Sequence, residues 1–340
     1  MHCPPKTLDR RLVLLSGAAA VTTFSIGRAR AAADFSYKMA TNVPATHPLN
    51  VRLAESFERI GKETNGALEI QLFPNNQLGA DTDVLAQLRS GAVEFFMLSG
   101  LILSTLVPVA AINGIGFAFA DYPTVWKAMD GELGAAIRAE IAKANIMAMD
   151  KIWDNGFRHM STSTKPILTP DDLKAVKMRV PVSPLWTSMF KAFGASPVSI
   201  NAAEMYSALQ TKIADGQENG LTAIWNTKVY EVQKNVALTG HMWDGYWALT
   251  NRRAWNAMPK DIQAIAAANL NRGAEDQRAD LERMNVGLQK DLEGKGMVFN
   301  TVEKSAFQAR LRQAGFYKEW QDRFGDANWK LLQRTAGAEL

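Results

Sequence analysis

The residue whose chemistry stands out in this sequence is an arginine inside a predicted strand. Arg179 lies between Met178 and Val180, where a strand alternates apolar and polar side chains. A buried guanidinium is costly in free energy unless it meets an anion, and its planar fork of donors fits a carboxylate through two parallel hydrogen bonds. The pattern therefore predicts either a bound carboxylate ligand or a structural salt bridge to an Asp or Glu of the chain.

The segment around Arg179 resembles a known family. Lys177, Arg179, Val180 and Pro181 match the Lys-x-Arg-Val-Pro strand of the substrate-binding subunits of tripartite ATP-independent periplasmic (TRAP) transporters, the dicarboxylate-binding-protein-like family. Further matching motifs follow in the family's order: Phe193–Pro197, Tyr206–Gln210, Asp215–Asn219 and Tyr230–Lys234. The resemblance runs from about Tyr37 to the C-terminal helices. It implies that Arg179 holds the carboxylate of an organic acid.

Two more residues follow from the same resemblance. Many family members carry an Asn-Gly-x-Arg-like element whose arginine gives a second contact to the acid, and Arg158 stands there in this chain. An interdomain salt bridge that helps closure is the alternative for Arg158. In the family, the asparagine of a Gly-Gln-Glu-Asn-Pro segment contacts the carboxylate, which implies this role for Asn219. Here Gly220 replaces the proline, which loosens the backbone after Asn219.

Neutral polar side chains are expected around the same cleft. Asn42 and Ser99 follow predicted strands, and ligands of open α/β sheets bind beyond the carboxyl ends of the strands. Together with Asn155, they are suited to hydrogen-bond ligand hydroxyls. For Ser99, capping of the next helix is an equal alternative.

A tryptophan is the last candidate for ligand contact. Trp225 lies about two helical turns beyond the Asn219 segment, where the family often faces the site. Its flat ring could stack on a sugar ring or an aromatic ligand, and core packing is the alternative.

These residues need a scaffold of alternating strands and helices. Strands Phe35–Ala40 and Leu68–Phe73, separated by a helix that ends near Thr64, predict a mainly parallel α/β sheet. Residues 147–153 are expected to form one further strand. A helix from Met258–Pro259 to Glu293 would be roughly 50 Å long at ~1.5 Å per residue.

The resemblance implies a two-lobed periplasmic binding protein, with the cleft between the lobes and this helix running across both. We expect lobe one to hold residues 34–155 plus about 241–282. Lobe two would hold residues 156–240 plus about 283–340.

Residues 1–33 are predicted to be a signal peptide outside this fold. Arg10–Arg11 precede the apolar run Leu12–Ile26, and small residues around Ala31 provide a cleavage site. The paired arginines favour twin-arginine export, the general secretory route stays open, and an N-terminal membrane anchor is the alternative. We therefore expect a periplasmic protein of a Gram-negative bacterium.

Removal of the signal peptide changes the charge balance. Subtracting its five basic residues and one acidic residue from the 38 basic and 34 acidic residues of the chain leaves 33 of each. The remaining chain has no excess of basic residues of the kind that nucleic-acid binding requires. The only cysteine, Cys3, lies in the same segment, so neither disulfides nor thiol chemistry is expected.

The sequence predicts a binding protein rather than an enzyme. His47, His159 and His241 share no metal-ligand spacing, and neither a nucleophile elbow nor a phosphate loop is present. Gly114-x-Gly116 lacks the third glycine of a dinucleotide fingerprint, because Phe119 stands there. We expect no cofactor, while a metal ion that bridges the ligand stays open.

The expected activity is capture of an organic acid by a monomer that delivers it to the membrane subunits of a TRAP transporter. A sensor-linked binding protein would share the fold and differ in its docking partner. Two arginines call for at least one carboxylate, and the neutral amides and hydroxyl fit a sugar acid such as a uronate or aldonate. An aromatic or other monocarboxylate is the alternative ligand.

Overall fold

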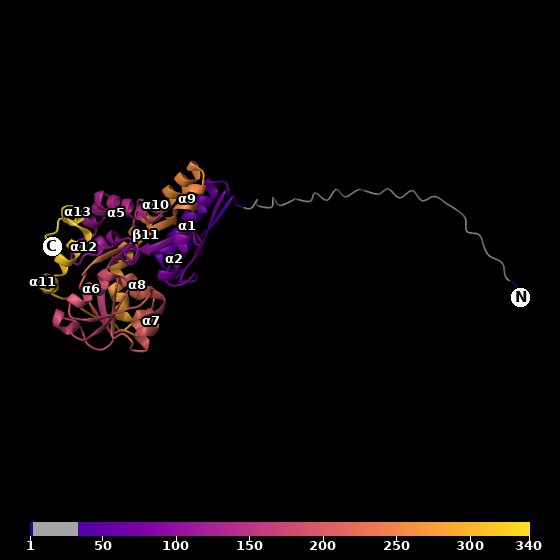
Figure 1. The fold of residues 1–340 in the computed structure, drawn as a ribbon. Coiled ribbons are helices and arrows are strands. Elements are labelled where there is room, and N and C mark those ends of the chain that lie inside the picture. The colour runs from indigo at the N-terminus through magenta and orange to yellow at the C-terminus, as the bar shows by residue number, and fades with distance from the viewer. Residues whose placement is uncertain (3–32) are drawn as a thin grey trace. The chain divides into compact units, whose positions relative to one another are not determined.

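The start of the folded unit follows the sequence pattern closely. The computed structural model describes residues 1–2 and 33–340 (Figure 1), so the predicted signal peptide lies almost wholly outside the described residues. Strands β1 (Phe35–Ala40) and β2 (Leu68–Phe73) pair in parallel with each other, and helix α1 (Pro48–Glu63) connects them in the sequence. The helix begins where the His47 side chain accepts a hydrogen bond from the Leu49 backbone N–H, and a proline at its first position has the fixed φ that a helix start needs.

The first sheet has the strand order β2-β1-β3-β11-β4, and β5 also pairs with β11. Its other strands are β3 (Phe95–Ser99), β4 (Ile146–Ala148), β5 (Trp153–Phe157) and β11 (Trp243–Asn251). Its associated helices are α2 (Asp81–Ser90), α3 (Gly100–Leu103), η1 (Pro108–Gly114), α4 (Tyr122–Met129), α5 (Glu132–Lys143) and α9 (Arg252–Ala257). Every residue of β11 is buried, since this strand runs through the middle of the sheet.

The second sheet has the order β12-β10-β6-β9-β7-β8. Its strands are β6 (His159–Thr162), β7 (Lys177–Val180), β8 (Ser196–Ser199), β9 (Gly216–Asn219), β10 (Asn235–Ala237) and β12 (Val298–Asn300). Its helices are η2 (Pro170–Leu173), α6 (Pro184–Ala192), α7 (Ala202–Gln210), α8 (Leu221–Asn226) and η3 (Val229–Glu231). Figure 1 shows α6, α7 and α8 grouped apart from α1, α2 and α9.

In each sheet five of the six strands run in the same direction, so the prediction of a mainly parallel sheet is confirmed, and one strand in each sheet runs against the others. Strand β11 is antiparallel to β3, β4 and β5, and β6 is antiparallel to β9 and β10. β6 and β11 each directly follow a passage of the chain from one sheet to the other, through β5–β6 and β10–β11, and a third passage leads from β11 to β12. The single strand expected over residues 147–153 is two strands, β4 and β5, which pair with different parts of β11.

The long helix predicted near the C-terminal third is present as α10 (Lys260–Gly294). It packs against α1 and β5 on the side of the first sheet and against α8 and β12 on the side of the second. The two-lobed α/β fold with a helix along both lobes is therefore confirmed. The exact lobe boundaries stay a prediction.

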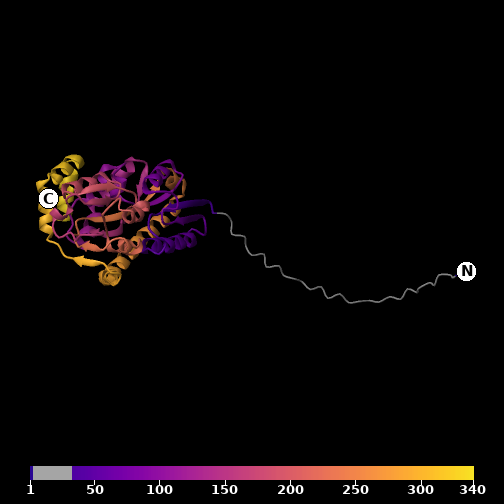
Figure 2. The ribbon, with the colours of Figure 1, turned by 90° about the horizontal axis from the view of Figure 1, so that it is seen from below.

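The chain ends with α11 (Lys304–Gln313), α12 (Phe316–Phe324) and α13 (Asp326–Ala336). Figures 1 and 2 show these yellow helices together at one edge of the folded unit. Helix α11 packs against α6, whereas α13 packs against α4 and α5, so this segment contacts elements of both expected lobes.

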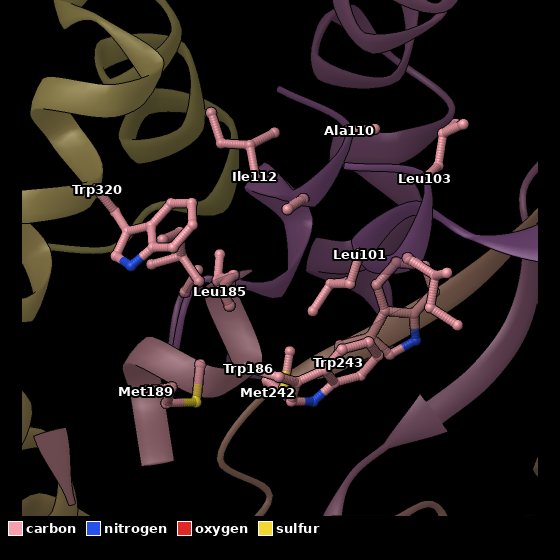
Figure 3. Close-up of a cluster of buried hydrophobic side chains, with 14 of the residues drawn as sticks. Leu101, Leu103, Ala110, Ile112, Leu185, Trp186, Met189, Met242, Trp243 and Trp320 are labelled. Carbon is pink, nitrogen blue, oxygen red and sulfur yellow. The ribbon is translucent and has the colours of Figure 1, made fainter. Parts of the chain in front are cut away.

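The largest hydrophobic core cluster joins both sheets. Figure 3 shows it with side chains from α3, η1, α6 and α12 around Met242 and Trp243. Within the described part of the chain, no helix combines the length and the apolar character that a membrane crossing requires.

Candidate functional site

A cavity of about 350 Å³ lies where the two sheets face each other. Six of the seven predicted site residues line it: Asn42, Ser99, Asn155, Arg158, Arg179 and Asn219. Five of these six are buried, and Asn42 is half-buried. Side chains from strands far apart in the sequence thus meet at one site, as the sequence predicts.

Arg179 projects from β7 and is 2% exposed. Its Nε donates to the Ile200 carbonyl at 2.9 Å, and its Nη1 lies 3.4 Å from the Met205 sulfur, a weak acceptor. No described carboxylate lies within ion-pair distance of this guanidinium. Burial lowers the pKa of Arg179 to about 10, and Glu218 and Asp81 partly offset this, so the group keeps its charge at neutral pH. A planar anion is the partner that this fork lacks.

Arg158 lies between β5 and β6 and has the same exposure but different partners. Its Nε and Nη2 donate to the two carboxylate oxygens of Glu218, at 2.5 and 2.8 Å. Its Nη1 lies 3.7 Å from Asp244 Oδ2, and its guanidinium covers the Trp186 ring at 4.9 Å. The salt bridge that is the alternative role for Arg158 is therefore present. Since Nε and Nη2 are occupied by Glu218, only Nη1 is left for the predicted ligand contact.

Glu218 and Asp244 hold Arg158 from the two sheets, since Glu218 lies in β9 and Asp244 in β11. Burial opposes the charge of Glu218, but Arg158 and His241 hold its pKa below the usual range. The pKa of Asp244 is raised by burial, against the opposing effects of Arg158 and two hydrogen bonds.

The neutral polar residues make hydrogen bonds that the sequence did not predict. Ser99 Oγ donates to Asp244 Oδ1 and Asn155 Nδ2 donates to Asp244 Oδ2, both at 2.8 Å. Ser99 also accepts from the Leu101 backbone N–H and caps α3, so its alternative role is confirmed. Asn42 Nδ2 donates to both carboxylate oxygens of Asp81.

Asn219 lies at the end of β9 and donates to Gln217 Oε1 at 3.0 Å. The glycine after it has a steric reason: a Cβ on Gly220 would lie 2.7 Å from the Asn155 carbonyl oxygen. Gly220 itself has an extended backbone, with φ −67° and ψ 152°. The departure from the family's proline thus lets β9 approach the segment that carries Asn155.

Trp225 differs from its predicted position, because it does not line the described cavity. Its ring tilts against Tyr230 at 5.7 Å between centroids, and the Lys295 ammonium lies over it at 5.6 Å from the ring centroid. Trp186, Tyr206 and Tyr246 are the aromatic residues that line the cavity.

Two acidic residues of the wall were missed at the level of sequence. Asp81 opens α2 and Asp244 lies in β11, and both are buried at the cavity. An aspartate within an apolar strand is the signal that could have identified Asp244. Asp81 stands at a helix start, where an acidic residue is ordinary.

The walls of the cavity also contact each other directly. Asn201 Nδ2, at the start of α7, lies 3.4 Å from the Thr82 hydroxyl in α2. Asn201 directly follows Ile200, the residue whose carbonyl accepts from Arg179. The residue whose carbonyl holds Arg179 and the residue that contacts α2 are thus adjacent in the chain.

Comparison with known proteins places the chain among bacterial binding proteins. A family model described as bacterial extracellular solute-binding protein, family 7, matches residues 39–321. A 2,3-diketo-L-gulonate-binding periplasmic protein of Escherichia coli is 29% identical over 280 residues, which cover 80% of this chain and 83% of that protein. An uncharacterized protein of Sinorhizobium fredii is 33% identical over 222 residues, and the match spans only 41% of its length.

Solved structures agree with this comparison. A TRAP periplasmic solute-binding protein of Roseobacter denitrificans with bound β-D-glucuronate superposes with a TM-score of 0.85 at 27% identity, covering 89% of this chain and 100% of that one. A TRAP protein of Sulfurospirillum deleyianum with bound succinate gives 0.82 at 28% identity, covering 90% and 100%. One fold thus binds a hydroxylated monoacid in one relative and a plain dicarboxylate in another.

Proposed function

Because this chain belongs to family 7 of the bacterial extracellular solute-binding proteins, the TRAP type, we propose that it captures a sugar acid and delivers it to the membrane subunits of a TRAP transporter. Uronates and aldonates are the leading ligands. The observation that carries the proposal is the buried guanidinium of Arg179, which has no carboxylate partner among the described residues.

A ligand carboxylate completes the coordination of this arginine. A buried charge without a counter-charge is destabilising by several kcal/mol, and an Arg–carboxylate pair forms two parallel charge-assisted hydrogen bonds. Asn219 and Arg158 Nη1 face the same cavity and add donors for the remaining lone pairs of the carboxylate. Arg179 therefore acts as the anchor, with Arg158 and Asn219 as supporting contacts.

The rest of the wall favours a hydroxylated ligand over an aromatic one. Asp81 and Tyr246 line the cavity and have capacity left to accept hydrogen bonds from ligand hydroxyls. Benzoate-like acids would leave this capacity unused. Trp225, the expected stacking face for a sugar ring or an aromatic ring, packs on Tyr230 instead, so the preference for a sugar acid rests on the polar groups of the wall.

The periplasm is the proposed compartment. The predicted signal peptide directs export, and the Escherichia coli relative is named as a periplasmic protein. Neighbouring genes for a small and a large membrane subunit would support transport, whereas a neighbouring sensor kinase would support the sensing alternative.

A thermal-shift screen of uronates, aldonates, C4-dicarboxylates and benzoates tests the ligand class. A ligand at 100 times its dissociation constant stabilises the folded state by ~2.7 kcal/mol, which is readily measured. We expect sugar acids to raise the melting temperature of the wild type and to have no effect on Arg179→Lys, because lysine keeps the charge but lacks the planar fork. Stabilisation by benzoates without stabilisation by sugar acids would overturn the proposed ligand class.

A further inference from the structure

Asp81 is the carboxylate of the cavity wall with the fewest partners. It is the first residue of α2, it is 1% exposed, and it lines the cavity opposite the second sheet. Both of its carboxylate oxygens accept from one group, Asn42 Nδ2, at 3.0 and 3.1 Å. Within the described chain it has no ion-pair partner. A carboxylate offers about four acceptor sites, so capacity remains for donors from a ligand.

The other two buried carboxylates near the cavity, Asp244 in its wall and Glu218 beside Arg158, are already paired. Glu218 binds the Arg158 guanidinium through both oxygens. Asp244 accepts from Ser99 and Asn155 and lies 3.7 Å from Arg158 Nη1. These contacts assign both groups to holding Arg158 in place. Asp81 is the carboxylate that remains to meet the ligand.

The charges of the wall count against a second anionic group on the ligand. Two buried arginines and two buried carboxylates line the cavity, and the remaining basic lining residue, Lys228, is exposed. A third buried carboxylate, Glu218, does not line the cavity but neutralises one of the arginines, Arg158. A monoacid bound at Arg179 already adds one negative charge. A second ligand carboxylate beside Asp81 would put two like charges at close range in a site shielded from water, where repulsion is strong.

We propose that Asp81 determines specificity, by accepting a hydrogen bond from a hydroxyl of the ligand and by excluding a second ligand carboxylate beside it. This inference rests on the proposed function and narrows it: the site takes hydroxylated monoacids and rejects the corresponding diacids. It also separates this chain from the relative that holds succinate, within one fold.

Because Asp81 can be protonated, the exclusion of diacids should depend on pH. Burial raises its pKa to about 6, against the lowering effects of Asn42 and Arg179. Below that pH the neutral carboxyl repels a second anion less and gains a donor of its own. Of the other groups that line the cavity, Asp244 also has a raised pKa, and Tyr246 stays neutral because its pKa is raised. The pKa of Glu218, which pairs with Arg158, is lowered.

The test compares acids that differ at one terminal carbon. Calorimetry at pH 8 measures D-galacturonate and D-galactonate against galactarate, and D-glucuronate and D-gluconate against D-glucarate. The proteins are the wild type, Asp81→Asn, Asp81→Ser and the control Asp83→Asn, which removes an exposed carboxylate of the same helix. Thermal melts establish that each variant is folded.

We expect the wild type to prefer a monoacid over its diacid by at least ~30-fold, about 2 kcal/mol. Asp81→Asn and Asp81→Ser should narrow this preference by at least ~10-fold, mainly through tighter diacid binding, while Asp83→Asn leaves it within about twofold. Acidification from pH 8 to pH 5 should reduce the preference for a monoacid over its diacid in the wild type and leave it unchanged in the Asp81 variants.

Three results would overturn the inference: a preference unchanged in the Asp81 variants, an equal loss of affinity for both acids, or a change of the same size in Asp83→Asn. Absence of binding of all six acids to the wild type would instead overturn the proposed function. The two failures are therefore distinguishable.

Discussion

Arg158 and Arg179 line the same cavity and are equally buried, at 2% exposure, yet their surroundings are opposite. Arg158 has two carboxylates from two sheets, whereas Arg179 has a backbone carbonyl and a sulfur among the described residues. The comparison teaches that burial of an arginine does not identify a ligand site. The distinguishing feature is whether the chain itself supplies the counter-charge.

The strongest test of this comparison is to remove the counter-charge of Arg158. Glu218→Gln should lower the unfolding free energy of the ligand-free protein by ~3–5 kcal/mol, because it leaves a buried charge without its main partner. Urea denaturation measures the change. The control is Glu132→Gln, which breaks the exposed pair with Arg334 and should cost less than about 1 kcal/mol. A Glu218→Gln protein as stable as this control would contradict the structural assignment of Arg158.

The matching change at the other arginine should have the opposite profile. Arg179→Met should abolish the binding of sugar acids, a loss of at least ~3 kcal/mol, because the anchor for the carboxylate is gone. The ligand-free protein should be as stable as the wild type or more so, since a buried and unpaired charge has been removed. Calorimetry and urea denaturation measure the two quantities. A strongly destabilised but ligand-binding variant would reverse the roles of the two arginines.

Two carboxylates near these arginines should respond oppositely to pH. The pKa of Glu218 is lowered, so its stabilising contribution is present above the unfolded-state value and is lost as the pH falls through the folded value. Burial raises the pKa of Asp81 to about 6. Between about pH 4 and pH 6, Asp81 is therefore protonated in the folded protein and ionised in the unfolded chain.

The stabilising effect of protonating Asp81 is therefore fully present below about pH 4 and is lost as the pH rises through about 6. Relative to the wild type, Asp81→Asn should become more stable by roughly 2–3 kcal/mol as the pH is raised from 4 to 7. Urea denaturation at both pH values measures this. A constant difference between the two proteins would mean that Asp81 titrates normally in the folded state.

The smallest expected effect concerns the neutral residue beside the anchor. Asn219→Ala should weaken sugar-acid binding by ~1–2 kcal/mol and leave the melting temperature of the ligand-free protein nearly unchanged. Calorimetry and a thermal melt test both parts. A large loss of stability without ligand would make Asn219 structural, like Arg158.

Local patterns were sufficient to predict much of the fold. β1 and β2 have the predicted bounds, and α10 follows the expected apolar pattern. The mainly parallel direction of the strands was predicted, but the antiparallel strand of each sheet was not, because pairing of β11 with β3, β4 and β5 joins segments far apart in the chain. A local pattern holds no information on such pairs.

The same limit applies to the site. The motifs located Arg179 in its strand, but the pairing of Arg158 with Glu218 depends on how β6 and β9 align. The direction of Trp225 depends on packing against Tyr230 and Lys295. Which predicted residues lack a partner inside the protein is a property of the whole fold, and that property carries the functional conclusion.

The contact between Asn201 and Thr82 has a thermodynamic consequence for the two walls. The segment that touches the first-sheet wall through Asn201 also holds the Arg179 guanidinium through the Ile200 carbonyl. Separation of the two segments would break the Asn201–Thr82 contact. It would also release the Ile200 carbonyl from its position beside the Arg179 guanidinium. Ligand affinity and wall closure then share one coupling free energy, which by linkage acts equally in both directions. Any change that weakens the Asn201–Thr82 contact should lower affinity without touching the ligand.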